Sequence, residues 1–287
     1  LHREHQCYCS EGPLQHIDHR WVFAAQCKQR ISAPDATRMA EAAPHRIAGR
    51  RPGDAPHDEK ATDGKPLIGV LALQGSVEEH IDVLHKLGAA TREIRVKEEV
   101  AGVDGLIFPG GESTAMAIMT EGDGLFPALR EAVGNGVPAY GTCAGLILLA
   151  DDCVGQKAGG QALVGGLDCT VCRNYFGAQV SSFELPLEGF PDAAPAVFIR
   201  APAILKRGPN CEALASVTSA PSRDAAPHVE AFEPAKKKRK GASAGEREVC
   251  VAARQGHILA TSFHPELTSD SRWHAMFLDM VRERKKE

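Results

Sequence analysis

The chain has 287 residues, of which 43% are hydrophobic and 24% are charged, and its formal net charge is −4 at pH 7. This composition is ordinary for a globular protein, and the length suits one large domain or two small ones. The negative balance argues against a general nucleic-acid surface, and no run approaches the roughly 20 apolar residues that span a membrane. Nine cysteines without framework spacing predict a reducing compartment, and we expect the cytoplasm.

Residues 1–65 are rich in His, Arg, Ala and Pro and show no sustained period of 2 or 3.6 residues. We interpret them as a disordered or non-native extension in front of a domain at residues 66–287. The start at Leu1 rather than methionine agrees with a fragment or with a translation that runs upstream of the true start. No metal is predicted here, because the potential zinc ligands lack paired spacings and a surrounding fold. These ligands are His2, His5, Cys7, Cys9, His16 and His19.

After the extension, strand-like and helix-like segments alternate. An apolar strand at residues 67–73 is followed by Val77, Ile81 and Leu84 at helical spacing. Such alternation predicts an α/β fold, a three-layer sandwich with a mostly parallel central sheet, as in flavodoxin-like proteins. The other expected strands are at residues 92–96, 104–111, 137–141, 211–217, 247–255 and 257–263. The other expected helices are at 113–119, at 124–136, directly after Cys143, and along the apolar stripe Trp273, Met276, Phe277, Met280 and Val281.

Cys143 lies in the run VPAYGTCAGLILLA, between a short apolar stretch and an apolar run of helical length. A strand that turns sharply into a helix presents the side chain at its tip, and Gly141 and Gly145 tolerate the crowding of such a turn. The free N–H groups of the helix start favour a thiolate, which is the nucleophilic form. A lone cysteine before an apolar helix is more often a small core residue, so the assignment depends on its partners.

The run SFHPEL supplies the partners, because His264 and Glu266 follow another apolar run, HILATSF. In a triad with Cys143, His264 would take and return protons. Glu266 would orient the imidazole and fix its tautomer. Cys143, His264 and Glu266 are therefore the candidate catalytic residues.

A third motif, PGGEST, follows the strand at residues 104–111. It lacks the GxxxxGK[ST] pattern of a phosphate loop. The backbone N–H groups of Gly111 and Ala144 are instead the candidate oxyanion hole. Because ligands bind at the carboxyl ends of parallel strands, we expect Gln74, Gly111, Cys143 and His264 to converge.

Several runs together resemble the glutaminase subunit family of pyridoxal 5′-phosphate synthase, which are class I, triad-type glutamine amidotransferases. The resemblance covers about residues 67–285 and includes LALQGSVEEH, DGLIFPGGEST, GTCAGLILLAD, GGLDCTVCRNYFGAQVSSFE, VFIRAP and ILATSFHPELT. It implies hydrolysis of L-glutamine to L-glutamate and ammonia through a γ-glutamyl thioester, without a cofactor. It also implies ammonia channelling to a synthase subunit, in a hetero-oligomer with a dodecameric core whose docking activates the glutaminase.

The resemblance also implies a set of glutamine-binding residues. The guanidinium of Arg200 stands in the apolar run AVFIRAP, where an arginine is costly, and a guanidinium can hold the carboxylate of a free amino acid in a two-pronged geometry. Arg173 is less distinctive by itself. The implied substrate contacts are Gly111, Glu112, Ser113, Arg173, Ile199 and Arg200.

The chain departs from the family pattern at two places. Cys172 replaces a family glutamate and forms a CxxC with Cys169, but residues three apart on a strand face opposite sides, which argues against a metal or redox pair. The second departure is an insertion at about residues 218–246, which we expect to be an exposed loop and which suggests a eukaryotic source. Its KKKRK run is either a solvated charge run or a nuclear-import signal, formed by Lys236, Lys237, Lys238, Arg239 and Lys240.

Other functions stay open at this point. The chain could feed another synthase, such as that of imidazole glycerol phosphate, or be a catalytically silent scaffold that kept the fold. The RN-x-FG and FIRAP runs favour the vitamin B6 pathway over the first alternative, and the intact triad argues against the second. A cysteine protease is disfavoured, because Arg173 and Arg200 suit a free amino acid better than a peptide.

Overall fold

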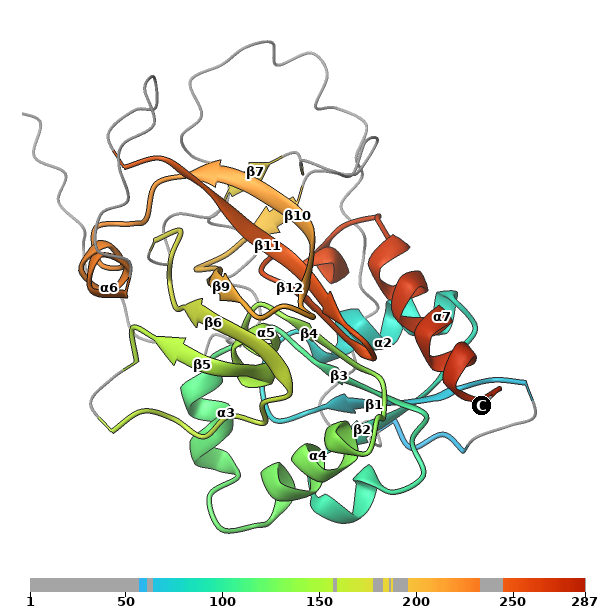
Figure 1. The fold of residues 1–287 in the computed structure, drawn as a ribbon. Coiled ribbons are helices and arrows are strands. Elements are labelled where there is room, and N and C mark those ends of the chain that lie inside the picture. Colours follow the sequence, from blue (N-terminus) through green and yellow to red (C-terminus); the bar gives the residue numbers. More distant parts are fainter. Residues whose placement is uncertain are drawn as a thin grey trace, which may run out of the picture. The chain divides into compact units, whose positions relative to one another are not determined.

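The computed structural model describes residues 57–60, 64–156, 159–177, 183–185, 187, 196–232 and 245–286. Within this part of the chain, a large central sheet lies between two layers of helices (Figure 1). None of the helices in the described ranges is long and apolar enough to cross a membrane.

Five parallel strands form one half of the sheet, in the order β2-β1-β3-β4-β12. This is the order of flavodoxin-like sheets, in which the winding direction reverses between the first and third strands. The four inner strands β1, β3, β4 and β12 are buried along their whole length, as a parallel sheet with helices on each side requires, whereas the edge strand β2 also carries polar residues. Their bounds are β1 Leu67–Leu71, β2 Ala90–Ile94, β3 Gly105–Phe108, β4 Ala139–Thr142 and β12 Ile258–Thr261.

The other half of the sheet is mixed. Strand β11 runs antiparallel to β12, β9 antiparallel to β11, and β6 antiparallel to β9, while β5 is parallel to β6 and β10 pairs with β11. Strands β7 and β8 form a small separate antiparallel pair. The bounds are β5 Ala150–Val154, β6 Leu167–Cys172, β7 Phe183–Leu185, β8 Ala196–Phe198, β9 Ala203–Arg207, β10 Glu212–Ser219 and β11 Arg247–Gln255.

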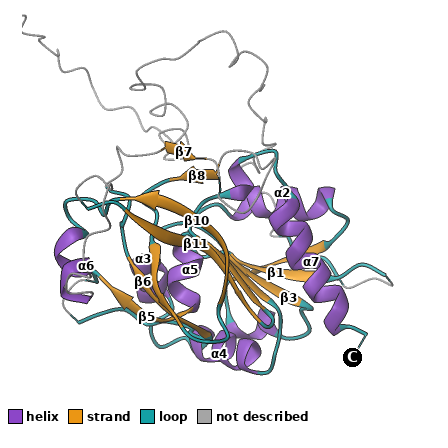
Figure 2. Ribbon diagram, turned by 45° about the horizontal axis from the view of Figure 1, so that its top comes forward, coloured by secondary structure: helices purple, strands orange, loops and turns teal. Residues whose placement is uncertain are grey.

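The helices cover the two faces of the sheet and give it two hydrophobic cores (Figure 2). Helices α3, α4 and α5 pack on one face, and α2 and α7 pack on the other. The expected α/β three-layer sandwich is therefore confirmed. The helices are α2 Val77–Lys86, α3 Ser113–Met119, α4 Leu125–Gly134, α5 Ala144–Leu149, α6 Ala226–Phe232 and α7 Arg272–Arg284, with short 3-10 turns η1 Lys97–Val100 and η2 Pro265–Leu267.

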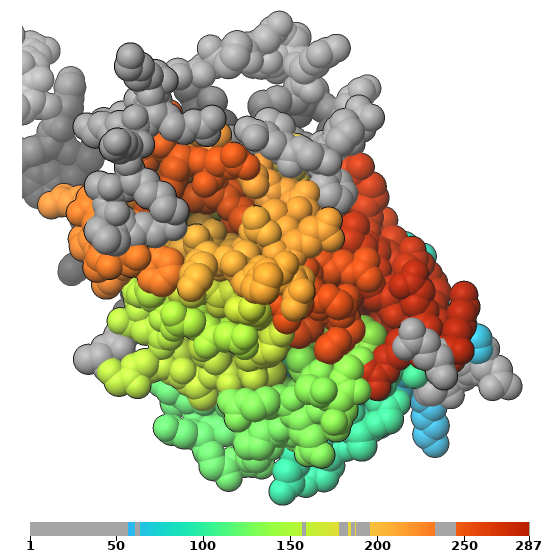
Figure 3. Space-filling view, in the orientation of Figure 1, coloured from blue at the N-terminus to red at the C-terminus, as the bar shows by residue number. Residues whose placement is uncertain are grey.

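Helix α7 closes the domain with the apolar stripe that the sequence predicts. Trp273, Phe277 and Val281 are buried, and each such side chain contributes about 1.5–3 kcal/mol. At the end of the helix, the Arg284 guanidinium donates to the Asn135 carbonyl at 2.9 Å. The C-terminal segment, red in Figure 3, thereby lies against a segment from the middle of the chain.

The CxxC pair lies on β6, and its two thiols face opposite cores. Cys169 packs in the core under α4, and Cys172 packs in the core under α2 and α7. Burial raises the pKa of the Cys169 thiol above its ordinary value, and that of Cys172 to about 11. The two thiols thus face opposite sides of the strand, as their spacing predicts, and the absence of a metal or redox pair here stays a prediction.

Part of the extension expected to be disordered is in fact paired with the sheet. Residues 57–60 run antiparallel to β2, where Asp58 bridges Arg92, and Glu59 N–H donates to the Thr91 carbonyl at 3.0 Å. The prediction was wrong here because β2 is an edge strand, whose free backbone groups bind any extended neighbour. The six potential zinc ligands lie outside the described residues.

The inserted segment is also more structured than expected. It contains the helix α6, in which Val229 is 1% exposed and packs into the core under α2 and α7. The Ser222 side chain caps the turn before this helix by accepting from Ala225 N–H at 3.2 Å. An exposed loop was therefore the wrong prediction for this part, because buried apolar residues anchor it. The KKKRK run Lys236, Lys237, Lys238, Arg239 and Lys240 lies outside the described residues, so the import signal stays a prediction.

Candidate active site

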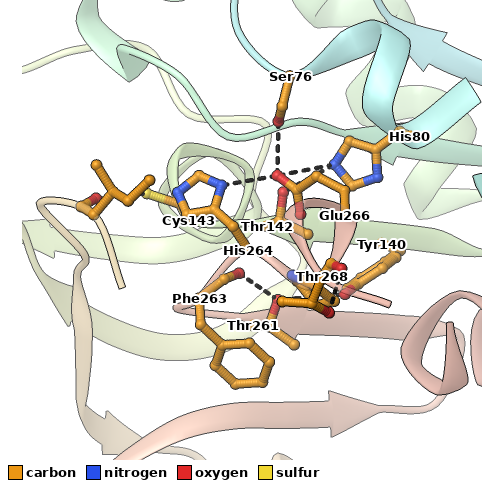
Figure 4. Close-up of polar contacts among 12 residues, drawn as sticks. Ser76, His80, Tyr140, Thr142, Cys143, Thr261, Phe263, His264, Glu266 and Thr268 are labelled. Atoms are coloured by element: carbon orange, nitrogen blue, oxygen red, sulfur yellow. Dashed lines mark hydrogen bonds and ion pairs between the residues drawn. The ribbon is translucent and has the colours of Figure 1, made fainter. Parts of the chain in front are cut away.

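The strand ends that the sequence singles out do converge. Glu112 N–H, after β3, donates to the Gln74 side chain after β1 at 2.6 Å. A methyl group built on Gly110 would come within 2.2 Å of the His264 ring after β12. Cys143, after β4, lies beside the His264 ring and helps to raise the pKa of that imidazole (Figure 4). Four parallel strands thus place one reactive cluster at their carboxyl edge, as expected for this architecture.

Cys143 sits at a strained turn between β4 and α5. Its φ is 49°, a backbone conformation that costs a non-glycine residue about 1–3 kcal/mol and that clusters at functional sites. The turn is crowded, because a methyl group on Gly145 would lie 1.8 Å from the Phe108 carbonyl oxygen, and one on Gly141 would lie 2.5 Å from the Gly145 backbone. Cys143 N–H donates to the Thr261 carbonyl at 2.8 Å, which ties the turn to β12. The sequence thus specifies a turn that holds the Cys143 thiol in a fixed position.

His264 and Glu266 lie side by side at the start of the turn η2 (Figure 4). The Nδ1 atom of His264 lies 2.8 Å from Glu266 Oε1, and both side chains are buried. Because a carboxylate only accepts, Nδ1 carries the proton, and Nε2 is left for the thiol of Cys143. The structure therefore brings the three predicted residues together, and the His264–Glu266 contact favours the tautomer that general-base chemistry needs.

Charge interactions decide the protonation of this triad. Burial alone would lower the pKa of His264, but the Glu266 carboxylate and Cys143 raise it, and the pKa ends well above its usual value. Burial alone would raise the pKa of Glu266, but His80, His264 and the Ser76 hydroxyl lower it, and the carboxyl stays ionised. The imidazolium is thus stabilised, so His264 holds a proton that a leaving group can take.

Two of the predicted substrate contacts bind each other. The Arg173 guanidinium donates to Glu112 Oε1 at 2.8 Å and to Thr114 Oγ1 at 2.9 Å. The second Glu112 oxygen accepts from Ala115 N–H and so caps α3. Ser113 is buried beside them. Predicted contacts from two distant segments of the chain therefore meet beside the PGGEST turn.

Ile199 lies next to the thiol, and Arg200 follows it in the chain. Cys143 Sγ lies 3.7 Å from the Ile199 carbonyl oxygen. Arg200 has a φ of 49°, and its guanidinium has no partner among the described residues. A half-buried, strained arginine without a partner suits an anionic ligand, because such a charge gains most from a bound carboxylate.

Sequence reasoning missed several residues of this cluster. Gly110 packs on the His264 ring, and Ser76 donates to Glu266 Oε1 at 2.7 Å. His80 lies on the helix that the sequence predicts here, and its ring reaches within 3.6 Å of the same carboxylate oxygen. The PGGEST motif already marked the neighbourhood of Gly110. For His80 no signal exists, because a histidine on an amphipathic helix is not distinctive.

Among the described residues, one group of three side chains could hold a metal ion, namely His57, Glu78 and Glu93. Glu93 is already bound by the Arg95 guanidinium and by the His57 N–H. A carboxylate with these partners is a poor cation ligand, so the group is better explained as the contact that fastens the segment at residues 57–60.

A Cys-His-Glu triad at the carboxyl edge of a parallel sheet defines a thiol-dependent enzyme of the α/β class, which acts on amide or acyl groups. Residues 70–283 match the SNO glutamine amidotransferase family. The chain belongs to this family of glutamine amidotransferases.

Curated relatives support the same assignment. The chain is 50% identical over 237 residues to the probable pyridoxal 5′-phosphate synthase subunit PDX2 of Arabidopsis thaliana, which covers 75% of this chain and 86% of the relative. It is 44% identical over 240 residues to the pyridoxal 5′-phosphate synthase subunit PdxT of Clavibacter sepedonicus. That match covers 83% of this chain and 98% of the relative. A solved glutamine amidotransferase structure matches with a TM-score of 0.59 and 38% identity, over 75% of this chain and 98% of that one. The fold is therefore that of the class I glutamine amidotransferases.

Proposed function

We propose that this enzyme hydrolyses L-glutamine to L-glutamate and ammonia and supplies the ammonia to the synthase subunit of pyridoxal 5′-phosphate synthase. The observation that carries the proposal is the preassembled triad of Cys143, His264 and Glu266. The relatives at 44–50% identity, which are named as subunits of that synthase, support this destination for the ammonia.

In the proposed reaction, the Cys143 thiolate attacks the side-chain amide carbon of glutamine. The C–N bond then breaks, and the His264 imidazolium gives its proton to the leaving ammonia, which leaves a γ-glutamyl thioester on the sulfur. His264, now neutral, takes a proton from a water molecule that attacks the thioester and releases glutamate. Glu266 stays ionised throughout and holds the imidazole.

The oxyanion formed in both steps needs fixed donors. We assign this role to the N–H groups of Gly111 and Ala144. Gly111 N–H has no acceptor in the part of the chain that the structure describes, whereas Glu112 N–H is committed to Gln74. A free N–H beside the nucleophile is what a developing oxyanion requires.

We also propose a glutamine-binding set, which the same geometry supports. Arg200 is the residue we assign to the substrate carboxylate, because its guanidinium has no partner in the described part of the chain, while that of Arg173 is held by Glu112. Arg173 then orders the Glu112 side chain at the rim of the site. The proposed substrate contacts are Gly111, Glu112, Ser113, Arg173, Ile199 and Arg200.

We expect Arg200→Met to raise the KM for glutamine by roughly 10- to 100-fold and to change kcat much less, because charged hydrogen bonds contribute about 1.5–3 kcal/mol. Steady-state ammonia release at varied glutamine concentration measures both constants. Arg254→Met, which removes a guanidinium bonded to the Gly256 carbonyl, is the control. An unchanged KM in Arg200→Met would remove this residue from the binding set.

The ammonia acceptor is the second part of the proposal. Free ammonia is lost to bulk water, so we infer that the chain docks on a synthase subunit, in a complex with a dodecameric core, and that docking activates the glutaminase. Six described cysteines are free thiols, which suits the reducing cytoplasm as the place of action.

Ammonia release should therefore be weak for the isolated chain and should rise when the synthase subunit is added. A coupled glutamate and ammonia assay on the full chain, with and without the partner, measures this effect. Full activity without the partner would contradict the docking proposal. No activity in either condition would favour the silent scaffold.

A further inference from the structure

Two histidines that the proposed reaction does not use are buried next to the triad. His80 on α2 and His274 on α7 are both 0% exposed, and His80 Nδ1 lies 2.9 Å from His274 Nε2. The other ring nitrogen of His80, Nε2, lies 3.1 Å from Thr142 Oγ1 and 3.6 Å from Glu266 Oε1 (Figure 4). The series His274, His80, Glu266 and His264 is therefore continuous from the core to the catalytic base.

We propose that His80 is a positioning residue of this enzyme: its Nε2–H holds the Glu266 carboxylate in place for His264, and His274 fixes the required tautomer of His80. The inference deepens the proposed function and rests on it, because it concerns the triad of that reaction.

Both buried imidazoles are neutral near pH 7. Burial lowers the pKa of His80, and the Glu266 carboxylate opposes this only in part. Burial and the neighbouring His80 also lower the pKa of His274, to about 3. A neutral imidazole carries one N–H, so His80 acts on Glu266 as a hydrogen-bond donor rather than as a cation. The titratable groups facing the pair are Glu266, His264, Tyr140 and Asp270.

Only one of the two neutral arrangements satisfies the surrounding groups. If His80 carried its proton on Nδ1, its bare Nε2 would face the carboxylate of Glu266, and His274 would carry an N–H at Nδ1. That Nδ1 has no partner among the described residues, and a buried unpaired N–H is costlier than a bare nitrogen. Protonation of both rings at Nε2 removes both problems. His274 then donates to His80, and His80 donates toward Glu266 and Thr142.

The Glu266 carboxylate depends on such a donor because it is anchored through one oxygen. Oε1 accepts from the Ser76 hydroxyl at 2.7 Å and from His264 Nδ1–H at 2.8 Å. Oε2 is buried without a hydrogen-bond partner in the described part of the chain. The contacts of Oε1 therefore determine the rotation of the carboxylate. His80 supplies the contact that comes from within helix α2.

The tautomers can be measured without any variant. Nitrogen-15 NMR of the uniformly labelled full chain, recorded near pH 7, distinguishes a protonated from a bare ring nitrogen in each histidine. We expect a proton on Nε2 alone in both His80 and His274, and protons on both ring nitrogens of His264, whose pKa is raised. A His80 protonated at Nδ1 would overturn the proposal, whether or not the chain hydrolyses glutamine, so this result is independent of the proposed function.

Two substitutions separate positioning from packing. In His80→Gln the side-chain amide nitrogen occupies about the place of Nε2, whereas in His80→Asn it lies near Nδ1 and the donor to Glu266 is lost. We expect His80→Asn to lower kcat roughly 10- to 100-fold, the range found for partners that orient an active-site histidine. His80→Gln should keep most of the rate, and the KM for glutamine should change little in both. His85→Gln, on the exposed side of the same helix, is the control.

The assays use the full chain with the synthase subunit, and thermal unfolding of each variant checks that it is folded. Equal kcat values for His80→Asn and the wild type would overturn the proposal, and so would an equal loss in His80→Gln and His80→Asn. If His80→Asn does not fold, the NMR tautomers and His80→Gln still decide. Inactivity of the wild type itself would instead count against the proposed function.

Discussion

Replacement of Cys143 by alanine is expected to lower ammonia release from glutamine by roughly 10⁴-fold or more, as is usual when a nucleophile is removed from a triad. Among the described cysteines we expect no other thiol to substitute for it, because only Cys143 acts on the pKa of His264. Most of them are buried in apolar surroundings that raise their pKa, for example that of Cys153 to about 12. Such thiols are not nucleophiles at neutral pH.

The measurement is ammonia and glutamate release by the full chain in the presence of the synthase subunit. Mass spectrometry of the acid-quenched wild type should also find a glutamyl adduct on the peptide that contains Cys143. Cys250→Ala, which removes a half-buried thiol on β11, is the matched control and should be fully active. Residual activity of Cys143→Ala within tenfold of the wild type would contradict the thioester mechanism.

The second large effect is expected for Glu266→Gln, at roughly 10³- to 10⁴-fold in kcat with little change in KM. The substitution preserves shape but removes the charge, and its amide can turn an N–H toward His264 Nδ1 and so favour the wrong tautomer. Because Glu266 is one cause of the raised pKa of His264, that pKa should fall in the variant. The sign follows from the loss of the charge that stabilises the imidazolium.

Kinetics and an NMR titration of the His264 ring test this second prediction together. Glu248→Gln, an exposed carboxylate on β11, provides the control for the loss of one negative charge. If the pKa of His264 were unchanged in Glu266→Gln while kcat fell, the carboxylate would act by geometry alone. If kcat were unchanged, Glu266 would not be part of the catalytic unit.

Much of the fold could be predicted because its signals are local. Apolar strands and amphipathic helices alternate along the chain, and the turn at Cys143 needs Gly141 and Gly145, which are visible in the letters. The triad could be predicted for the same reason, since Cys143 and His264 each follow an apolar strand and Glu266 stands two residues after His264. Parallel strands then bring such ends together without further information.

The features that were missed depend on contacts between distant segments. Residues 57–60 look like polar linker and become ordered only because they meet the free edge of β2. Helix α6 is held by the burial of Val229, and a single valine in an Ala- and Pro-rich segment is no periodic signal. His80 gains its role from Glu266, 186 positions further along the chain, through the packing of α2 on η2.

The pairing of residues 57–60 with β2 has a practical consequence for anyone who expresses this enzyme. A shortened chain that starts after residue 60 would lose only polar residues in front of the domain. It would, however, also lose the segment that pairs with the edge strand β2. The uncovered backbone of β2 could then recruit the same strand of a second molecule. Such a product would self-associate with rising concentration, and its loss from solution would be mistaken for poor folding of the catalytic domain.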